Sequence, residues 1–219
     1  MKYGVDVSEW QSGVAWEKLH PDFVLIRAGH GLEHDTDVGI NIRKAKKLNV
    51  PWGVYWCHET GCRGETEAAA ALTMWTENNY PTLGIWFDVE PDVKQPAAGE
   101  AAAAFCKEVE SAGYYAGVYG SGWVLDSMPI EAWDRWEASW GPNNGEPDWH
   151  EKPDTGTLWQ YTSNLVIDGN RVDGDICMYD DMSFYDQKKW ELKLTLEQRL
   201  IKLRSELDAI IKDVKESIK

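Results

Sequence analysis

The chain has 219 residues and a formal net charge of −15, a size at which an α/β or all-β barrel can form one domain. Residues 190–219 are almost neutral, so the acidity belongs to the rest of the chain. Such a charge repels phosphate backbones, and we therefore expect no nucleic-acid partner. No segment approaches the ~18–20 apolar residues of a membrane span, so we expect no membrane insertion.

Short apolar segments alternate with helical stretches through the first two thirds of the chain, a pattern typical of a parallel sheet with crossover helices. The strands predicted in this part are 3–7, 23–28, 52–57, 84–90 and 115–119. Helices are predicted at 38–48, 65–78 and 99–111. Loops rich in Gly, Pro, Asn and Asp connect three further strands, at 135–140, 157–161 and 171–178. The pattern predicts an α/β barrel with about eight strands and about five helices.

The character of the sequence changes near residue 192. Apolar side chains recur at intervals of four and three residues, with mostly charged residues between them, at Leu196, Leu200, Leu203, Leu207, Ile210 and Val214. This spacing is typical of a heptad seam on an amphipathic helix. We therefore predict two units, a barrel over 1–187 and a helix over 188–219. The seam favours homo-oligomerisation through residues 192–218; docking onto the barrel and a spacer role are the alternatives.

The strand predicted at 84–90 ends in two carboxylates, Asp88 and Glu90. Side chains of a strand alternate between its faces, so this spacing predicts that both acids point to the same side, with Cα atoms roughly 6.5–7 Å apart. Buried strands rarely carry two acids without a reason, because each carboxylate loses its hydration. The pair is typical of a glycosidase; surface acids at a solvated strand end are the alternative.

Other acids accompany two further strands. Asp6 belongs to the first strand, and Asp173 and Asp175 lie near the last. If the strands close in order, the first and last become neighbours, so Asp6 and one of the late aspartates should meet beside the Asp88/Glu90 pair. Like charges oppose ionisation, and we expect this crowding to raise the pKa of Glu90.

Several segments, in order along residues 3–180, resemble glycoside hydrolase family 25, the Chalaropsis-type lysozymes found in bacteria and as phage endolysins. They are Gly4-Val5-Asp6-Val7-Ser8-Glu9-Trp10-Gln11, Phe23-Val24-Leu25-Ile26-Arg27-Ala28, Gly53-Val54-Tyr55, Asp88-Val89-Glu90, Gly117-Val118-Tyr119 and Trp159-Gln160-Tyr161-Thr162-Ser163. The resemblance implies a TIM-like (β/α)5(β)3 barrel. It also implies cleavage of the β-1,4 bond between N-acetylmuramic acid and N-acetylglucosamine in peptidoglycan.

The resemblance assigns roles to the acids. Glu90 matches the family's proton donor, and Asp88 matches the aspartate that steers the substrate's 2-acetamido group. Asp6 matches the first-strand aspartate. For the late acid, Val172-Asp173-Gly174-Asp175 matches the family pattern, and we prefer Asp173. Asp175 is the alternative, because the glycine between the two aspartates and the loop before them leave the register open.

Substrate-binding residues are sought among aromatic side chains near strand ends, because flat rings stack on sugar faces. The candidates are Tyr55, Tyr119, Trp140, Trp159 and Tyr161. Packing inside the barrel or its shell is the alternative for each. Arg27 ends a barrel strand and is a candidate to hold an acid or a substrate group, with a structural ion pair as the alternative.

The peptidoglycan glycan strand is the expected partner, and we expect neither a cofactor nor a metal. The first strand begins almost at Met1, so we expect synthesis in the cytoplasm without a signal peptide and action on the cell wall after release, as in an endolysin. A non-catalytic glycan-binding module assembled through the C-terminal helix is the alternative function. A chitinase-like enzyme is a third possibility that the Asp-Val-Ser-Glu-Trp-Gln segment disfavours.

Overall fold

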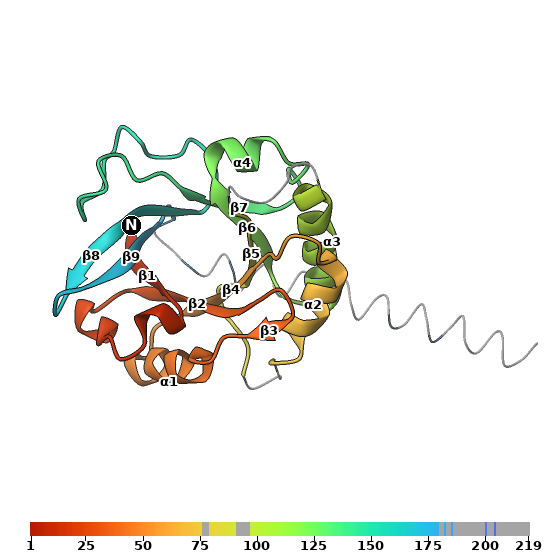
Figure 1. The fold of residues 1–219 in the computed structure, drawn as a ribbon, viewed down its shortest axis with the longest axis horizontal. Coiled ribbons are helices and arrows are strands. Elements are labelled where there is room, and N and C mark those ends of the chain that lie inside the picture. Colours follow the sequence, from red (N-terminus) through yellow and green to blue (C-terminus); the bar gives the residue numbers. More distant parts are fainter. Residues whose placement is uncertain are drawn as a thin grey trace, which may run out of the picture.

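A computed structural model describes residues 1–75, 79–90 and 97–179, together with Met182, Tyr185, Leu200 and Arg204. Its strands form a closed barrel (Figure 1). Eight strands close it, and a short strand, β3 (Glu33–His34), pairs only with the end of the second. The barrel strands are β1 (Lys2–Val7), β2 (Phe23–His30), β4 (Trp52–Cys57), β5 (Ile85–Asp88), β6 (Ala116–Ser121), β7 (Asp134–Ala138), β8 (Leu158–Ile167) and β9 (Asn170–Cys177).

The barrel closes between its first and last strands, as predicted. The ladder from β1 through β2, β4, β5, β6 and β7 to β8 is parallel throughout. The last strand, β9, runs antiparallel to both β8 and β1. The amino-terminal half of β9 therefore lies beside the carboxyl end of β1, which places Asp173 opposite Asp6.

Helices cover only part of the barrel (Figure 1). Helices α1 (Val38–Leu48), α2 (Gly64–Leu72), α3 (Ala97–Ser111) and α4 (Gly122–Asp126) follow β2, β4, β5 and β6 in turn. Only 3-10 turns, Glu9–Gln11 and Trp16–Leu19, follow β1, and the described chain has no helix after β7 or β8. This order confirms the predicted (β/α)5(β)3 architecture, with 3-10 turns in place of the first helix.

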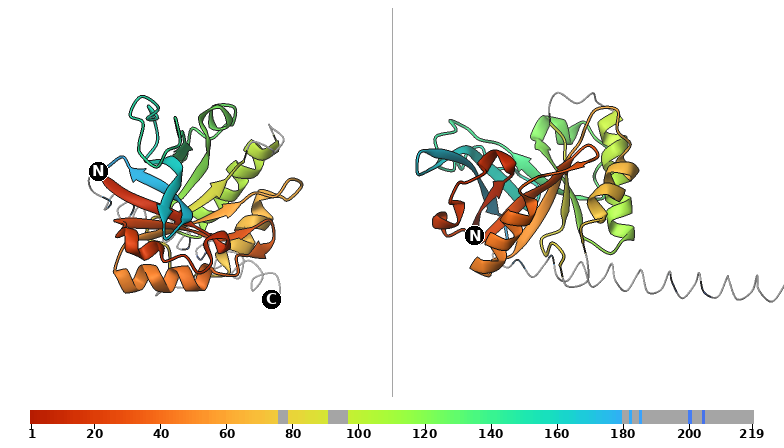
Figure 2. Two further views of the ribbon diagram at one scale, coloured as in Figure 1. Left: turned by 60° about the vertical axis from the view of Figure 1, so that its left-hand side comes forward. Right: turned by 60° about the horizontal axis from the view of Figure 1, so that its bottom comes forward.

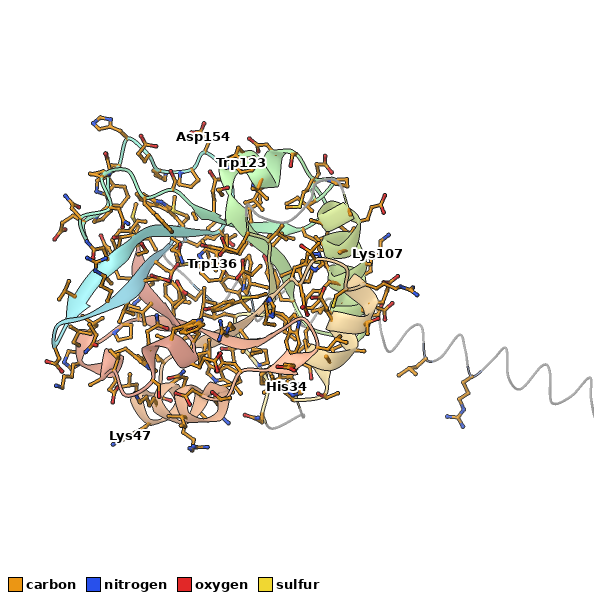
Figure 3. The ribbon with its side chains drawn as sticks, viewed as in Figure 1. His34, Lys47, Lys107, Trp123, Trp136 and Asp154 are labelled. Carbon is orange, nitrogen blue, oxygen red and sulfur yellow. The ribbon has the colours of Figure 1, made fainter. Side chains whose placement is uncertain are left out.

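The packing forms two main layers. Side chains that alternate outward from β1 to β6 pack against the helices in one large core, which includes Val7, Ile26, Trp56 and Phe87. Those that alternate inward fill the barrel, and Trp136 lies near its centre (Figure 3). Because both faces of these strands are buried, their sequences read as continuous apolar runs rather than as alternating patterns.

The β8–β9 hairpin extends away from the helices and lacks a helical cover (Figures 1 and 2). Its turn is Asp168-Gly169, with φ angles of 50° and 79°. A two-residue Asp-Gly turn with both φ angles positive is a strong hairpin signal. The sequence contains it, yet β8 was predicted only over 157–161, so the prediction missed the outer half of this strand.

The sequence-based bounds of other elements were also inexact. The strand predicted at 84–90 begins at Ile85, because Gly84 has a φ angle of +84°, and it ends at Asp88. Helix α4 was not predicted, since its five residues show no helical period. The predicted helix over 188–219 lies outside the described residues apart from Leu200 and Arg204, so the division at residue 187 and the heptad seam stay predictions.

Candidate active site

Polar side chains gather inside one end of the barrel, at the carboxyl ends of its parallel strands. Strand register places Cys57 beside Asp88 and Asp88 beside Tyr119. On the other side of the opening, Asp6 is paired with Asp173. We call this end the mouth, defined by these five residues. It unites three of the four acids predicted from the sequence.

Glu90 lies two residues beyond the end of β5 and is solvent-exposed, whereas Asp88 is buried. The regular strand therefore ends before Glu90. Its carboxyl group is nevertheless near the other acids, because its charge acts on both Asp88 and Asp173. The two carboxylates of the pair thus differ in environment, one at the rim and one in the wall of the mouth.

Asp88 holds its proton unusually tightly. Burial, followed by the charge of Glu90, raises its pKa to about 8. The Cys57 thiol donates a hydrogen bond of 2.9 Å to Oδ2, and this contact and the charge of Arg27 oppose the rise. Oδ1 is buried and has no hydrogen-bond partner among the described residues. In the substrate-free protein the acid pair therefore keeps a proton at neutral pH.

The aspartates of β1 and β9 form a second acidic group. Burial and the charge of Glu90 raise the pKa of Asp173 to about 6. Burial and then the charges of Asp173 and Asp175 raise the pKa of Asp6. Asp175 is fully buried, its pKa is raised chiefly by burial, and it accepts a hydrogen bond of 2.8 Å from Trp136 Nε1. Asp173 thus lies at the mouth, and Asp175 lies deeper in the barrel.

Gln160 connects this acidic group to the rim, and the sequence analysis assigned it no role. Its Nε2 donates to Asp6 Oδ2 at 2.8 Å. Its Oε1 accepts from the Tyr119 hydroxyl at 2.8 Å and from Trp140 Nε1 at 2.9 Å. Gln160 could have been found from the Trp159-Gln160-Tyr161 segment, because it lies between two residues that were predicted to bind the substrate.

The aromatic candidates divide between the two faces of the barrel wall. Tyr55 and Tyr119 face inward and pack on Trp136, with ring centroids 5.6 and 4.4 Å apart. Trp140 follows β7 at the rim, is 39% exposed, and is held by its hydrogen bond to Gln160. These three side chains lie near the acids, Tyr55 and Tyr119 in the wall and Trp140 at the rim.

Trp159 and Tyr161 do not reach the mouth, contrary to the sequence-based expectation. They flank the inward-facing Gln160, so alternation directs them to the outer face of β8. There Trp159 is fully buried, and its Nε1 donates to the Ser139 carbonyl at 2.7 Å. Tyr161 packs edge-on against the outward-facing Tyr3. Both side chains belong to a small core outside the barrel.

Arg27 is engaged in ion pairs. Its Nε bonds to Asp35 Oδ2 at 2.7 Å and its Nη2 to Glu9 Oε1 at 2.6 Å. Asp35 also accepts the backbone N–H groups of Glu9 and Asp37, which ties the segments after β1 and β2 together. The arginine therefore has the structural role weighed as its alternative, while its charge still favours the ionised form of Asp88.

The sequence and the fold of this chain both resemble those of known proteins. The profile of Glycosyl hydrolases family 25 matches residues 5–170. The catalytic domain of endolysin ply40 from bacteriophage P40 of Listeria monocytogenes is 24% identical, with a TM-score of 0.71 over 86% of this chain and 97% of that domain. Glycosyl hydrolase 25 GHIP of Streptococcus pneumoniae is 21% identical, with a TM-score of 0.72 over 85% of this chain and 92% of that one.

A third solved structure contains a ligand. The modular Cpl-1 endolysin, complexed with a peptidoglycan analogue, is 20% identical, with a TM-score of 0.65 over 83% of this chain and 56% of that one. No curated protein matches the chain. At these identities the solved structures show only that the fold is shared. The family is shown by the profile match.

The chain belongs to glycosyl hydrolases family 25, because the profile covers most of its barrel. It is therefore a glycoside hydrolase, and its substrate class is the peptidoglycan that muramidases of this family cleave. A non-catalytic glycan-binding module is not favoured, since the acids that the chemistry needs are present.

Proposed function

We propose that this protein cleaves the β-1,4 bond between N-acetylmuramic acid and N-acetylglucosamine, with Glu90 as the proton donor. The observation that carries the proposal is the convergence of Asp6, Asp88, Glu90 and Asp173 on one mouth, with Glu90 exposed, Asp6 and Asp88 buried, and Asp173 half-buried. The peptidoglycan analogue bound to the Cpl-1 endolysin supports a glycan strand as the ligand.

The reaction proceeds in two steps. Glu90 gives its proton to the glycosidic oxygen, the bond from that oxygen to C1 breaks, and the acetamido oxygen of the muramic acid bonds to C1. Asp88 accepts a hydrogen bond from the acetamido N–H, which becomes more acidic as positive charge develops. Water then attacks C1, the bond from C1 to the acetamido oxygen breaks, and the water passes a proton to Glu90, which restores the acid. Asp6 and Asp173 stabilise the positive charge of the transition state.

The Asp88/Glu90 pair needs one proton, and this proton moves from one carboxyl group to the other during the reaction. In the substrate-free protein the buried Asp88 holds this proton, because its pKa is raised to about 8. When the acetamido group reaches Oδ1, its N–H stabilises the Asp88 carboxylate, and the proton becomes available to Glu90. The two residues titrate as a pair, so the pair carries the macroscopic pKa. A raised pKa for Glu90 itself stays a prediction.

This arrangement predicts a bell-shaped pH profile for kcat/KM on a soluble peptidoglycan fragment. As pH falls through about 6, Asp173 becomes protonated and its charge is lost from the mouth. As pH rises through about 8, the acid pair loses its proton and Glu90 has none to give. A rate that keeps rising from pH 8 to pH 10 would contradict this assignment.

Trp140 should contribute to glycan binding. Removing the ring by Trp140→Ala should raise KM for a soluble fragment roughly 3–10-fold, the range expected for one aromatic contact, and change kcat less. Trp149→Ala is the matched control, since Trp149 is 47% exposed but packs on Trp159 outside the barrel. Equal KM values for the two variants would remove Trp140 from the binding site.

We further propose that the protein is an endolysin, acting on the wall after release from the cell that makes it. The likeness to endolysin ply40 from bacteriophage P40 and to the Cpl-1 endolysin supports this biological role. Among the described residues, no helical segment has both the length and the apolar character of a membrane span. Homo-oligomerisation through residues 192–218 stays a prediction.

A further inference from the structure

Cys57 is the one thiol at the mouth among the described residues, and it contacts an acid of the proposed mechanism. Its Sγ donates to Asp88 Oδ2 at 2.9 Å, and the second oxygen of Asp88 is buried with no partner in the part of the chain that the structure describes. We propose that Cys57 is a positioning residue that fixes Asp88 with Oδ1 directed to the substrate and sets the alkaline limit of activity. This inference rests on the proposed function, because it assigns Asp88 to the substrate's acetamido group.

The backbone holds the two side chains together. Cys57 and Asp88 are register partners in the β4–β5 ladder, so their side chains emerge side by side on the inner face. The next residue along, His58, donates its backbone N–H to the Asp88 carbonyl at 2.9 Å. The His58 ring is anchored by Glu67, with Nδ1 and Oε2 2.7 Å apart. The thiol therefore meets the carboxyl group from a fixed position.

The thiol remains a donor over the working range of the enzyme. Burial, and then the charge of Asp88, raises the pKa of Cys57 well above its ordinary value, so its proton stays in place. The four cysteines are free in the structure. The Sγ–H group therefore serves neither as a disulfide partner nor as a thiolate nucleophile, and its contact with Asp88 is its visible role.

The choice of a thiol has an electrostatic consequence. A hydrogen bond to a carboxylate favours the ionised form, and the Cys57 contact lowers the pKa of Asp88 against the larger effect of burial. Because S–H is a weak donor, it orients the carboxyl group while leaving its proton affinity high. A hydroxyl at the same place would stabilise the carboxylate more, and a methyl group would not stabilise it at all.

Three variants of the full chain test the inference through the pH dependence of kcat/KM. Cys57→Ala should move the alkaline limb upward by roughly half to one pH unit and lower kcat roughly 3–10-fold. Cys57→Ser keeps a donor, so it should retain most of kcat and move the limb downward. Cys106→Ala is the control, because Cys106 is buried behind β6, where its thiol meets the Gly117 carbonyl at 3.7 Å. It should leave the limb unchanged.

A second measurement separates this inference from the function itself. In protein labelled with ¹³C at aspartate carboxyl carbons, the signal absent from Asp88→Asn should titrate higher in Cys57→Ala and lower in Cys57→Ser than in wild type. Alkaline limbs and titrations that coincide in wild type and both Cys57 variants would overturn the inference, and Cys57→Ser alone suffices if the alanine variant does not fold. A wild-type protein that cleaves no glycan but shows these titration shifts would instead overturn the proposed function.

Discussion

Replacing Glu90 with glutamine should reduce peptidoglycan hydrolysis by roughly 10²–10⁴-fold, the range associated with loss of a general acid. The amide has nearly the same shape, but it has no proton to give to the glycosidic oxygen. Glu90 is exposed and lies outside the barrel ladder, so the fold and the affinity for glycan should be preserved. Turbidity loss of purified peptidoglycan measures the rate, and binding to the same walls measures the affinity.

The control for this variant is Glu131→Gln, which makes the same change at an exposed glutamate on the loop between α4 and β7. It should clear the walls at the wild-type rate. Wild-type lysis by Glu90→Gln would reject Glu90 as the proton donor. Equal loss of activity in both variants would point to an unspecific effect of charge.

Replacing Asp88 with asparagine should lower kcat by roughly 10²–10³-fold, because the acetamido group loses the charge that stabilises it in the transition state. The side chain still fills the wall beside Cys57, so glycan binding should change little. In wild type, loss of the pair's proton should lower kcat/KM as pH rises through about 8. In the Asp88→Asn variant this alkaline limb should no longer lie near pH 8. A variant that retains both the rate and the limb would show that Asp88 takes no part.

The same substitution should stabilise the fold, and increasingly so as pH rises. The pKa of Asp88 is about 8 in the folded protein against an ordinary value of 3.8, so the folded state binds more protons between these values. Its contribution to stability is therefore fully present below pH 3.8 and is lost as pH rises through about 8. Urea unfolding of both proteins at pH 5 and pH 8 measures this, and a pH-independent difference would contradict it.

Such a cost is common at active sites, where function requires groups that the fold alone would not select. Asp6, Asp88 and Asp175 are buried acids with raised pKa values in a chain that already carries a formal net charge of −15. Arg27 offsets part of this charge. Its ion pairs with Glu9 and Asp35 hold it beside the acids. The mouth is thus maintained by the barrel around it.

Local patterns were sufficient for most of the barrel. The apolar runs of β2 and β4 and the helical period of α1 are visible in the sequence, and the predicted bounds 52–57 and 38–48 agree with β4 and α1. Closure in chain order also correctly placed Asp6 beside one of the late aspartates, and the register of β1 with β9 shows that it is Asp173. The antiparallel direction of β9 depends on the Asp168-Gly169 turn, a signal that was present and not used.

The orientation of side chains at strand ends was harder to predict. Trp159, Gln160 and Tyr161 are consecutive, and which face each occupies depends on the register of β8 against β9, which shifts between Gln160 and Thr162. A shift of one residue exchanges the two faces, so sequence alone could not tell the inward amide from the outward rings. The proton affinity of Asp88 depends on burial by the whole barrel, and no local pattern contains that information.

The most direct test of the account is digestion of purified peptidoglycan by the wild-type protein, followed by mass analysis of the new reducing ends. Muramidase action with Glu90 as the acid predicts falling turbidity and products that end in N-acetylmuramic acid, with neither seen for Glu90→Gln. Products that end in N-acetylglucosamine, or walls that the wild-type protein leaves intact, would contradict it.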